Sequence, residues 1–137
     1  MQIKLFLVFV LSFGGSSAVQ SSGGLADMIA SNLPFVVEAS PGSFDRYSFE
    51  GIELAGHTRC VVGADELSLY WLEQRKDILL KYHAVCYLAN VHSLAEIDRV
   101  RQVAHPVPVV LASASALVSI FNIKFYPAII YSNWVLQ

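Results

Sequence analysis

From Gly56 onward, short apolar runs alternate along the chain with longer segments of helical periodicity. The runs span roughly four to eight residues and the helical segments roughly eight to eighteen, which are the lengths typical of strands and helices. Strands that alternate with helices bury their apolar faces against them, and this is how an α/β domain is built. We therefore predict one α/β domain with the element order βαβαβαββ.

The predicted elements follow from apolar runs, caps and turns. In order, they are a strand at Arg59–Val62, a helix from Asp65 to about Tyr82, a strand at Ala84–Val91, a helix at Leu94–Ala104, a strand at Val107–Ala112, a short helix from Ser113 or Ser115 to near Asn122, and strands at Ala128–Tyr131 and Trp134–Leu136. The last two strands flank a tight turn and should pair antiparallel.

Both long helices begin with a cap and carry an apolar stripe. Asp65 caps the first helix, and Ser93 with Glu96 forms a capping box for the second. The first stripe should face the core with Leu67, Trp71, Leu72, Ile78, Leu79 and Tyr82. The second should do so with Leu94, Ile97, Val100 and Val103.

Residues 1–18 have the composition of a secretory signal peptide. Lys4 precedes an uncharged apolar run, Leu5–Phe13, and small residues follow up to Ala18. Basic, apolar and small-residue regions in this order are typical of export signals, and the run is far shorter than the roughly 20 residues that span a bilayer. We expect cleavage near Ala18 and a periplasmic mature protein without a membrane span.

Charge argues against a nucleic-acid ligand. Cleavage removes Lys4, one of nine basic residues, and none of the eleven acidic ones, so the mature chain has a formal charge of −3. Proteins that bind a phosphate backbone carry clustered lysines and arginines, and the sequence holds no such cluster. We therefore exclude nucleic acid as a direct ligand.

The residues after the signal peptide differ in composition from the rest. Val19–Arg46 is rich in Ser, Gly and Ala, with one apolar patch at Leu33–Val37 and a turn at Pro41–Gly42. We expect a flexible leader and an extended lead-in segment over residues 19–46. The α/β domain should then occupy residues 47–137.

The two cysteines, Cys60 and Cys86, lie inside the first two predicted strands. Buried thiols have raised pKa values and react poorly, so the sequence favours a packing role for both. A structural disulfide between them is the second interpretation, because the two strands could be neighbours and the compartment oxidising. A catalytic role is the third.

Other reactive side chains show no pattern of a site. The four histidines lie on different connections without metal-ligand spacing; they are His57, His83, His92 and His105. Capping explains Ser93 better than nucleophilic catalysis with His92 does, since adjacent side chains do not point at each other. We predict no catalytic, cofactor-binding or metal-binding residues.

The segment Ala116–Ile130, ALVSIFNIKFYPAII, together with the element order, resembles the thioredoxin-like fold, in which a helix leads to a cis-proline that opens the edge hairpin. The resemblance implies a mixed central sheet and makes Pro127 the candidate cis-proline. A trans proline that starts an edge strand is the alternative.

A working oxidoreductase of this fold carries C-x-x-C at the start of a helix, where the helix dipole lowers the pKa of the attacking thiol. We expect that position after the second strand, at His92–Ala95, which holds no cysteine. The resemblance therefore implies a degenerate thioredoxin-like domain without the redox motif.

Four segments resemble a family of small exported proteins encoded on bacterial integrating conjugative elements, related to the thioredoxin-like TrbC and TraW proteins of conjugative secretion systems. They are LPFVVEASPG (Leu33–Gly42), VVGADELSLYWLEQR (Val61–Arg75), YLANVHSLAEI (Tyr87–Ile97) and FYPAIIYSNWVLQ (Phe125–Gln137). The resemblance implies a non-enzymatic periplasmic component of a type IV secretion system, which assists pilus or core-complex assembly for DNA transfer. Its partners would be other conjugative secretion-system proteins. The alternative is a thiol-dependent periplasmic redox protein or chaperone.

The resemblance also puts the hairpin Pro127–Gln137 at a sheet edge with no helix after it. Ala128–Leu136 holds no charge, so the usual protection of an edge strand is absent. We predict that this hairpin, with Tyr131 and Trp134, docks onto a partner. Phe121 we assign to the core.

Overall fold

The computed structural model describes residues 24–52 and 56–137, which fall into two units that divide after Asn32. In the N-terminal unit, residues 24–31 form a helix whose side chains are nearly all exposed. Leucine, alanine and methionine in this segment favour a helix;. The predicted signal peptide, residues 1–18, lies outside the described residues.

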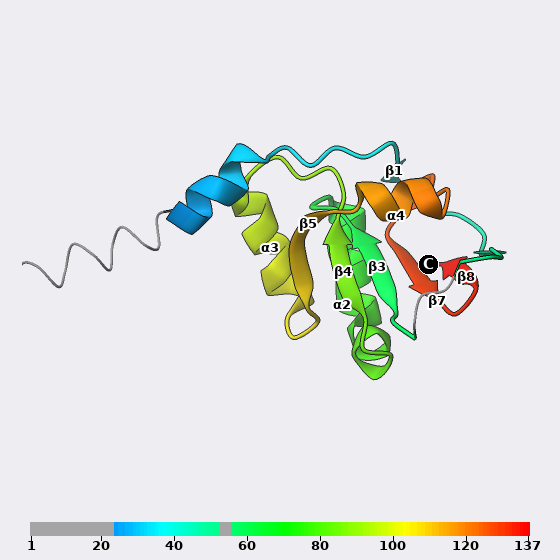
Figure 1. The fold of residues 1–137 in the computed structure, drawn as a ribbon. Coiled ribbons are helices and arrows are strands. Elements are labelled where there is room, and N and C mark those ends of the chain that lie inside the picture. The colour runs from blue at the N-terminus through cyan, green and yellow to red at the C-terminus, as the bar shows by residue number, and fades with distance from the viewer. Residues whose placement is uncertain (1–23, 53–55) are drawn as a thin grey trace, which may run out of the picture. The chain divides into compact units, whose positions relative to one another are not determined.

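Six strands of the C-terminal unit form a mixed sheet in the order β2-β8-β7-β3-β4-β5 (Figure 1). Their bounds are β2 Tyr47–Ser48, β3 Arg59–Val62, β4 Val85–Leu88, β5 Val109–Ser113, β7 Ala128–Tyr131 and β8 Trp134–Leu136. Strands β3, β4 and β5 run parallel, whereas β3–β7, β7–β8 and β8–β2 are antiparallel pairs. Two further short strands, β1 (Ser40–Pro41) and β6 (Phe125–Tyr126), pair parallel with each other.

Helices α2 (Glu66–Lys81) and α3 (Leu94–Ala104) begin at the predicted caps. A side-chain oxygen of Asp65 accepts the N–H of Ser68 at 2.9 Å, and the Ser93 hydroxyl accepts the N–H of Glu96 at 3.2 Å. The Glu96 carboxylate accepts from the N–H of His92 at 2.7 Å, one residue earlier than the capping box predicts. Asp65 and Ser93 are thus confirmed as N-caps, and the capping box differs from the predicted one in the residue that donates to Glu96.

The sheet separates two apolar layers. Val61, Ala128 and Ile130 belong to a buried cluster that includes Phe121 and residues of α4 (Ser115–Ile120). Because side chains alternate along a strand, Cys60, Val62 and Leu88 point to the opposite layer, which α2 and α3 cover. The chain therefore has the predicted thioredoxin-like α/β fold, with β3-α2-β4-α3-β5-α4-β7-β8 as its βαβαβαββ order.

The lead-in segment, which in the structure runs from Leu33 to Arg46, is part of the C-terminal unit. Phe35 exchanges two backbone hydrogen bonds with Val91, of 2.8 and 3.1 Å, and β1 pairs with β6. The compact unit therefore starts at Leu33 rather than at residue 47. Pairings of one or two residues have no periodicity, so the sequence alone does not reveal them.

The predicted position of the hairpin at a sheet edge is wrong. Strand β2 pairs with the outer side of β8, with Tyr47 opposite Val135 and Ser48 opposite Trp134. Strands β2 and β5 form the two edges instead. An unprotected edge is therefore no argument for docking at the hairpin, although its two faces still have to be considered. Within the described ranges, no helix is both long and apolar enough to cross a membrane.

Candidate functional site

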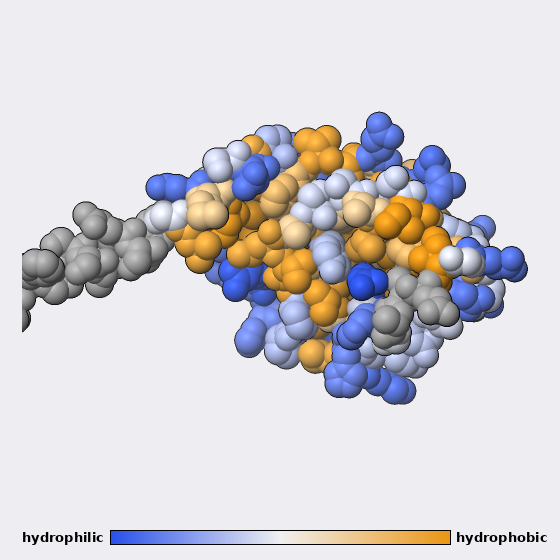
Figure 2. Space-filling view, in the orientation of Figure 1, coloured by the Kyte–Doolittle hydropathy of each residue, from blue (hydrophilic) through white to orange (hydrophobic). Residues whose placement is uncertain are grey.

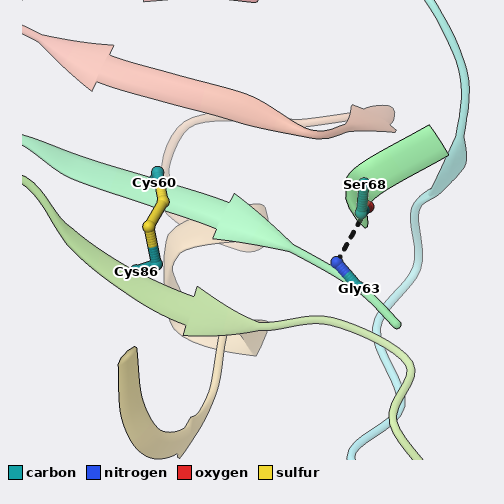
Figure 3. Close-up of a disulfide and its surroundings, with 4 residues drawn as sticks. All are labelled: Cys60, Gly63, Ser68 and Cys86. Atoms are coloured by element: carbon teal, nitrogen blue, oxygen red, sulfur yellow. Dashed lines mark hydrogen bonds between the residues drawn. A yellow bond between two sulfur atoms is a disulfide. The ribbon is translucent and has the colours of Figure 1, made fainter. Parts of the chain in front are cut away.

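Cys60 and Cys86 form a disulfide between β3 and β4 (Figure 3). The two residues are directly paired in the ladder, their Cα atoms are 4.4 Å apart, and both side chains are fully buried. The favoured prediction of free buried thiols is wrong, and the second interpretation, a structural disulfide, is confirmed. A disulfide is compatible with an exported protein.

The candidate cis-proline is confirmed, since the Tyr126–Pro127 peptide bond is cis. Strand β7 follows it and pairs with β3, the strand that leads into α2. A Cβ atom added to Gly63, which follows β3, would lie 2.8 Å from the ring of Tyr126. The helix that starts beside the cis-proline is therefore α2 rather than α3. The prediction that places the C-x-x-C position of the fold at His92–Ala95 is wrong, since this position corresponds to the start of α2.

At the start of α2, polar side chains hydrogen-bond to one another and to the backbone. The Ser68 hydroxyl is buried and donates to a carboxylate oxygen of Asp65 at 2.8 Å. It also accepts the N–H of Gly63 at 3.0 Å (Figure 3). No cysteine occurs between Gly63 and Ser68. The polar groups that could serve a reaction at this helix start are satisfied by each other.

Tyr126 is buried beside this helix start, and its hydroxyl accepts from the side-chain amide of Asn90 at 2.9 Å. Burial raises the pKa of Tyr126, and the Asp65 carboxylate raises it further, while the Asn90 hydrogen bond lowers it. The phenol is thus kept neutral. This arrangement is suited to holding the fold together rather than to proton transfer at neutral pH.

The hairpin β7–β8 buries Ile130 and Val135 on the side of α4, and on its opposite side it forms an aromatic surface together with α2. We define this surface as Ile78, Tyr82, Tyr131, Trp134 and Leu136. Tyr131 lies opposite Trp134 in the β7–β8 ladder, so both side chains leave the sheet on one face;. The rings of Tyr82 and Tyr131 have centroids 4.7 Å apart and planes inclined at 54°. The exposed fractions are 43% for Ile78, 40% for Tyr82, 42% for Tyr131 and 36% for Trp134.

A small cavity of about 170 Å³ opens within the aromatic surface, between α2 and the hairpin. Ile78, Tyr82, Tyr131 and Leu136 line it, with the buried Ile129 among the remaining wall residues. An apolar cavity of about 150 Å³ accommodates a benzene ring. This cavity therefore has the size and character to receive one aromatic or branched side chain.

Two cations lie over the rings of this surface. The Arg46 guanidinium carbon is 5.1 Å from the ring centroid of Trp134, and the Lys81 ammonium nitrogen is 5.6 Å from that of Tyr82. Such contacts orient a cation over the negative face of a ring. Neither Arg46 nor Lys81 forms an ion pair with another described residue.

Sequence reasoning identified Tyr131 and Trp134 and missed the rest of the surface. The sequence predicts Ile78 and Tyr82 in the buried stripe of α2. Of that predicted stripe, however, only Trp71, Leu72 and Leu79 are buried. The stripe as predicted was wider than the face that one helix buries against a sheet. Its excess width was the available signal that Ile78 and Tyr82 lie beside the core. Phe121 is buried, as predicted.

A comparison with protein families matches residues 16–135 to the family described as "Protein of unknown function (DUF2859)". The chain belongs to this family. The DUF2859 match includes both disulfide cysteines and all of the aromatic surface except Leu136. No curated protein and no solved structure matches the chain. In the part of the chain that the structure describes, no group of three or more His, Cys, Asp or Glu side chains is arranged to hold a metal ion.

Proposed function

We propose that this DUF2859 protein is an exported, non-enzymatic component of a conjugative type IV secretion system, where it assists pilus or core-complex assembly for DNA transfer. The aromatic surface carries the proposal. Tyr82 and Tyr131 line its cavity and pack on each other, and Trp134 lies opposite Tyr131 in the hairpin. Large aromatic side chains around a pocket dominate the binding energy of protein interfaces. The partner on this surface is another protein of the secretion system.

The link to conjugative transfer is supported by the sequence resemblance over Leu33–Gly42, Val61–Arg75, Tyr87–Ile97 and Phe125–Gln137. The periplasmic location is supported by the signal-peptide pattern of residues 1–18 and by the disulfide, a bond that persists in oxidising compartments;. N-terminal sequencing of the envelope-fraction protein should therefore begin near Val19.

A role without catalysis is favoured by the state of the cysteines. The redox alternative requires an accessible thiol of low pKa, whereas both sulfur atoms are joined to each other inside the sheet. Asp65 and Ser93 cap the starts of α2 and α3, and neither position carries a cysteine.

A mating experiment tests the function. Deleting the gene from a donor that carries the element should abolish transfer, and the wild-type gene supplied in trans should restore it. The double variant Cys60→Ala/Cys86→Ala should also restore transfer wherever it accumulates as folded protein, because the disulfide has only a structural role. Unchanged transfer after deletion would contradict the secretion role, and failure of a folded double variant would favour the redox alternative.

A further inference from the structure

A second cleft, of about 410 Å³, lies between the lead-in segment and α4. Val36 and Glu38 form one wall, and Val118, Ser119 and Lys124 contribute to the other. Figure 2 shows apolar and polar atoms side by side over the region of α4. The volume is in the range of ligand-binding clefts, and the cleft is separate from the aromatic surface.

In the lead-in segment, the backbone of residues 35–39 forms hydrogen bonds along one edge only. Phe35 bonds to Val91, while the side chain of Asn90 accepts from the N–H of Val37 and donates to the carbonyl of Ala39, each at 2.9 Å. Val36 and Glu38 alternate with these residues and form no backbone hydrogen bond with any described residue. Both are solvent-exposed.

The missing partner strand has a local cause. Further along the lead-in segment, the N–H groups of Ser40 and Gly42 donate to the carbonyls of Lys124 and Tyr126, at 3.1 and 3.0 Å. That pairing cannot extend back to Glu38, because Asn122 has a positive φ of 52° at the end of α4 and Ile123 bonds back to Val118. The chain opposite Val36–Glu38 is therefore helical, and the cleft lies between this segment and α4.

We propose that an extended segment of a partner polypeptide binds in this cleft and adds as a short strand against Val36–Glu38, where it continues the pairing that β1 and β6 begin. Backbone groups left unpaired at the edge of an extended segment are a template for such addition. The partner segment alternates an apolar side chain, directed to Val118, with polar ones. Glu38 and Lys124 form no ion pair with described residues, so a basic and an acidic residue on the segment complement them. This inference does not depend on the secretion role.

The probe is a capped peptide of alternating valine and polar residues, acetyl-Thr-Val-Lys-Val-Glu-Val-Thr-amide, added to ¹⁵N-labelled protein purified from cells that express the full chain. We expect amide chemical-shift changes at Val36, Glu38 and Ser119. Methylating the backbone nitrogens along one edge of the peptide removes the donors that pair with the lead-in segment, so affinity should fall at least about tenfold. Methylation along the other edge should leave affinity unchanged.

Two variants of α4 locate the site. Ser119→Phe fills the cleft from an exposed position and should abolish binding, whereas Ala116→Phe, at an exposed position of the same helix outside the cleft, should bind as the wild type does. Circular dichroism establishes that both fold. The proposal is overturned if the unmethylated peptide causes no shifts, if both methylated peptides bind equally well, or if Ser119→Phe binds normally.

Discussion

Asn90 joins the lead-in segment to the sheet through one side chain. Its oxygen accepts from Val37, and its amide nitrogen donates both to Ala39 and to the hydroxyl of Tyr126. Its backbone has a positive φ of 46°, a conformation that asparagine tolerates better than other residues with a Cβ atom. One residue type therefore meets a backbone and a side-chain requirement at the end of β4.

Replacing Asn90 separates these two requirements. Asn90→Ala loses all three hydrogen bonds and strains the backbone, so the free energy of unfolding should fall by about 2–4 kcal/mol. Asn90→Gly loses the same bonds without the steric strain and should be about 1 kcal/mol more stable than Asn90→Ala. Urea unfolding followed by circular dichroism measures both. Equal stability of Asn90→Ala and the wild type would contradict this role.

Among the elements, the disulfide ties β3 to β4 through cysteines that are 26 positions apart in the sequence, with the whole of α2 between them. Closing a loop of this length removes conformational entropy from the unfolded chain, and we expect Cys60→Ala/Cys86→Ala to lower the free energy of unfolding by about 3–4 kcal/mol. Guanidinium unfolding of the two proteins measures the difference.

Reductant provides the control for this prediction. Dithiothreitol should lower the unfolding midpoint of the wild type and leave that of the double variant unchanged, because only the wild type has a bond to reduce. The disulfide contributes nothing to stability if the wild-type midpoint stays the same once the bond has been fully reduced in the unfolded chain.

The longer elements were predictable from sequence because they depend on local chemistry. Asp65 and Ser93 satisfy free N–H groups at helix starts, and the β-branched run ending at Val62 favours a strand, whatever the rest of the chain does;. The pairing of Cys60 with Cys86, and of β2 with β8, depends on register between distant segments. No local pattern encodes that register, so the sequence offered the disulfide only as one of three interpretations of the cysteines and did not indicate the β2–β8 pairing.

The same distinction applies to the candidate site at the scale of the whole molecule. Tyr131 and Trp134 are neighbours in one uncharged hairpin and were predicted together. Ile78 and Tyr82 join them only because α2 leaves the face of β7 partly uncovered, and Arg46 joins them from the segment before β2. The periodicity of apolar residues within α2 does not indicate which strand packs beside Ile78 and Tyr82.

The aromatic surface and the lead-in cleft lie on opposite faces of the sheet, one beside α2 and the other beside α4. A partner bound at one face would leave the other accessible. If both faces bind partners as proposed, the protein would link two components of an assembly.

The proposed docking of the aromatic surface onto the secretion assembly is tested by Tyr131→Lys. The exposed position should tolerate lysine, but the added charge lies beside Lys81 and removes the ring that packs on Tyr82. The matched control is Tyr70→Lys, at a tyrosine of α2 that is 64% exposed and lies outside the aromatic surface.

The measurement is the amount of secretion-system protein that co-purifies with each variant from envelopes of cells carrying the element, at equal levels of folded protein. Tyr131→Lys should reduce co-purification at least about tenfold, as expected for an aromatic residue central to an interface, and Tyr70→Lys should match the wild type. Undiminished co-purification with Tyr131→Lys would contradict docking through the aromatic surface.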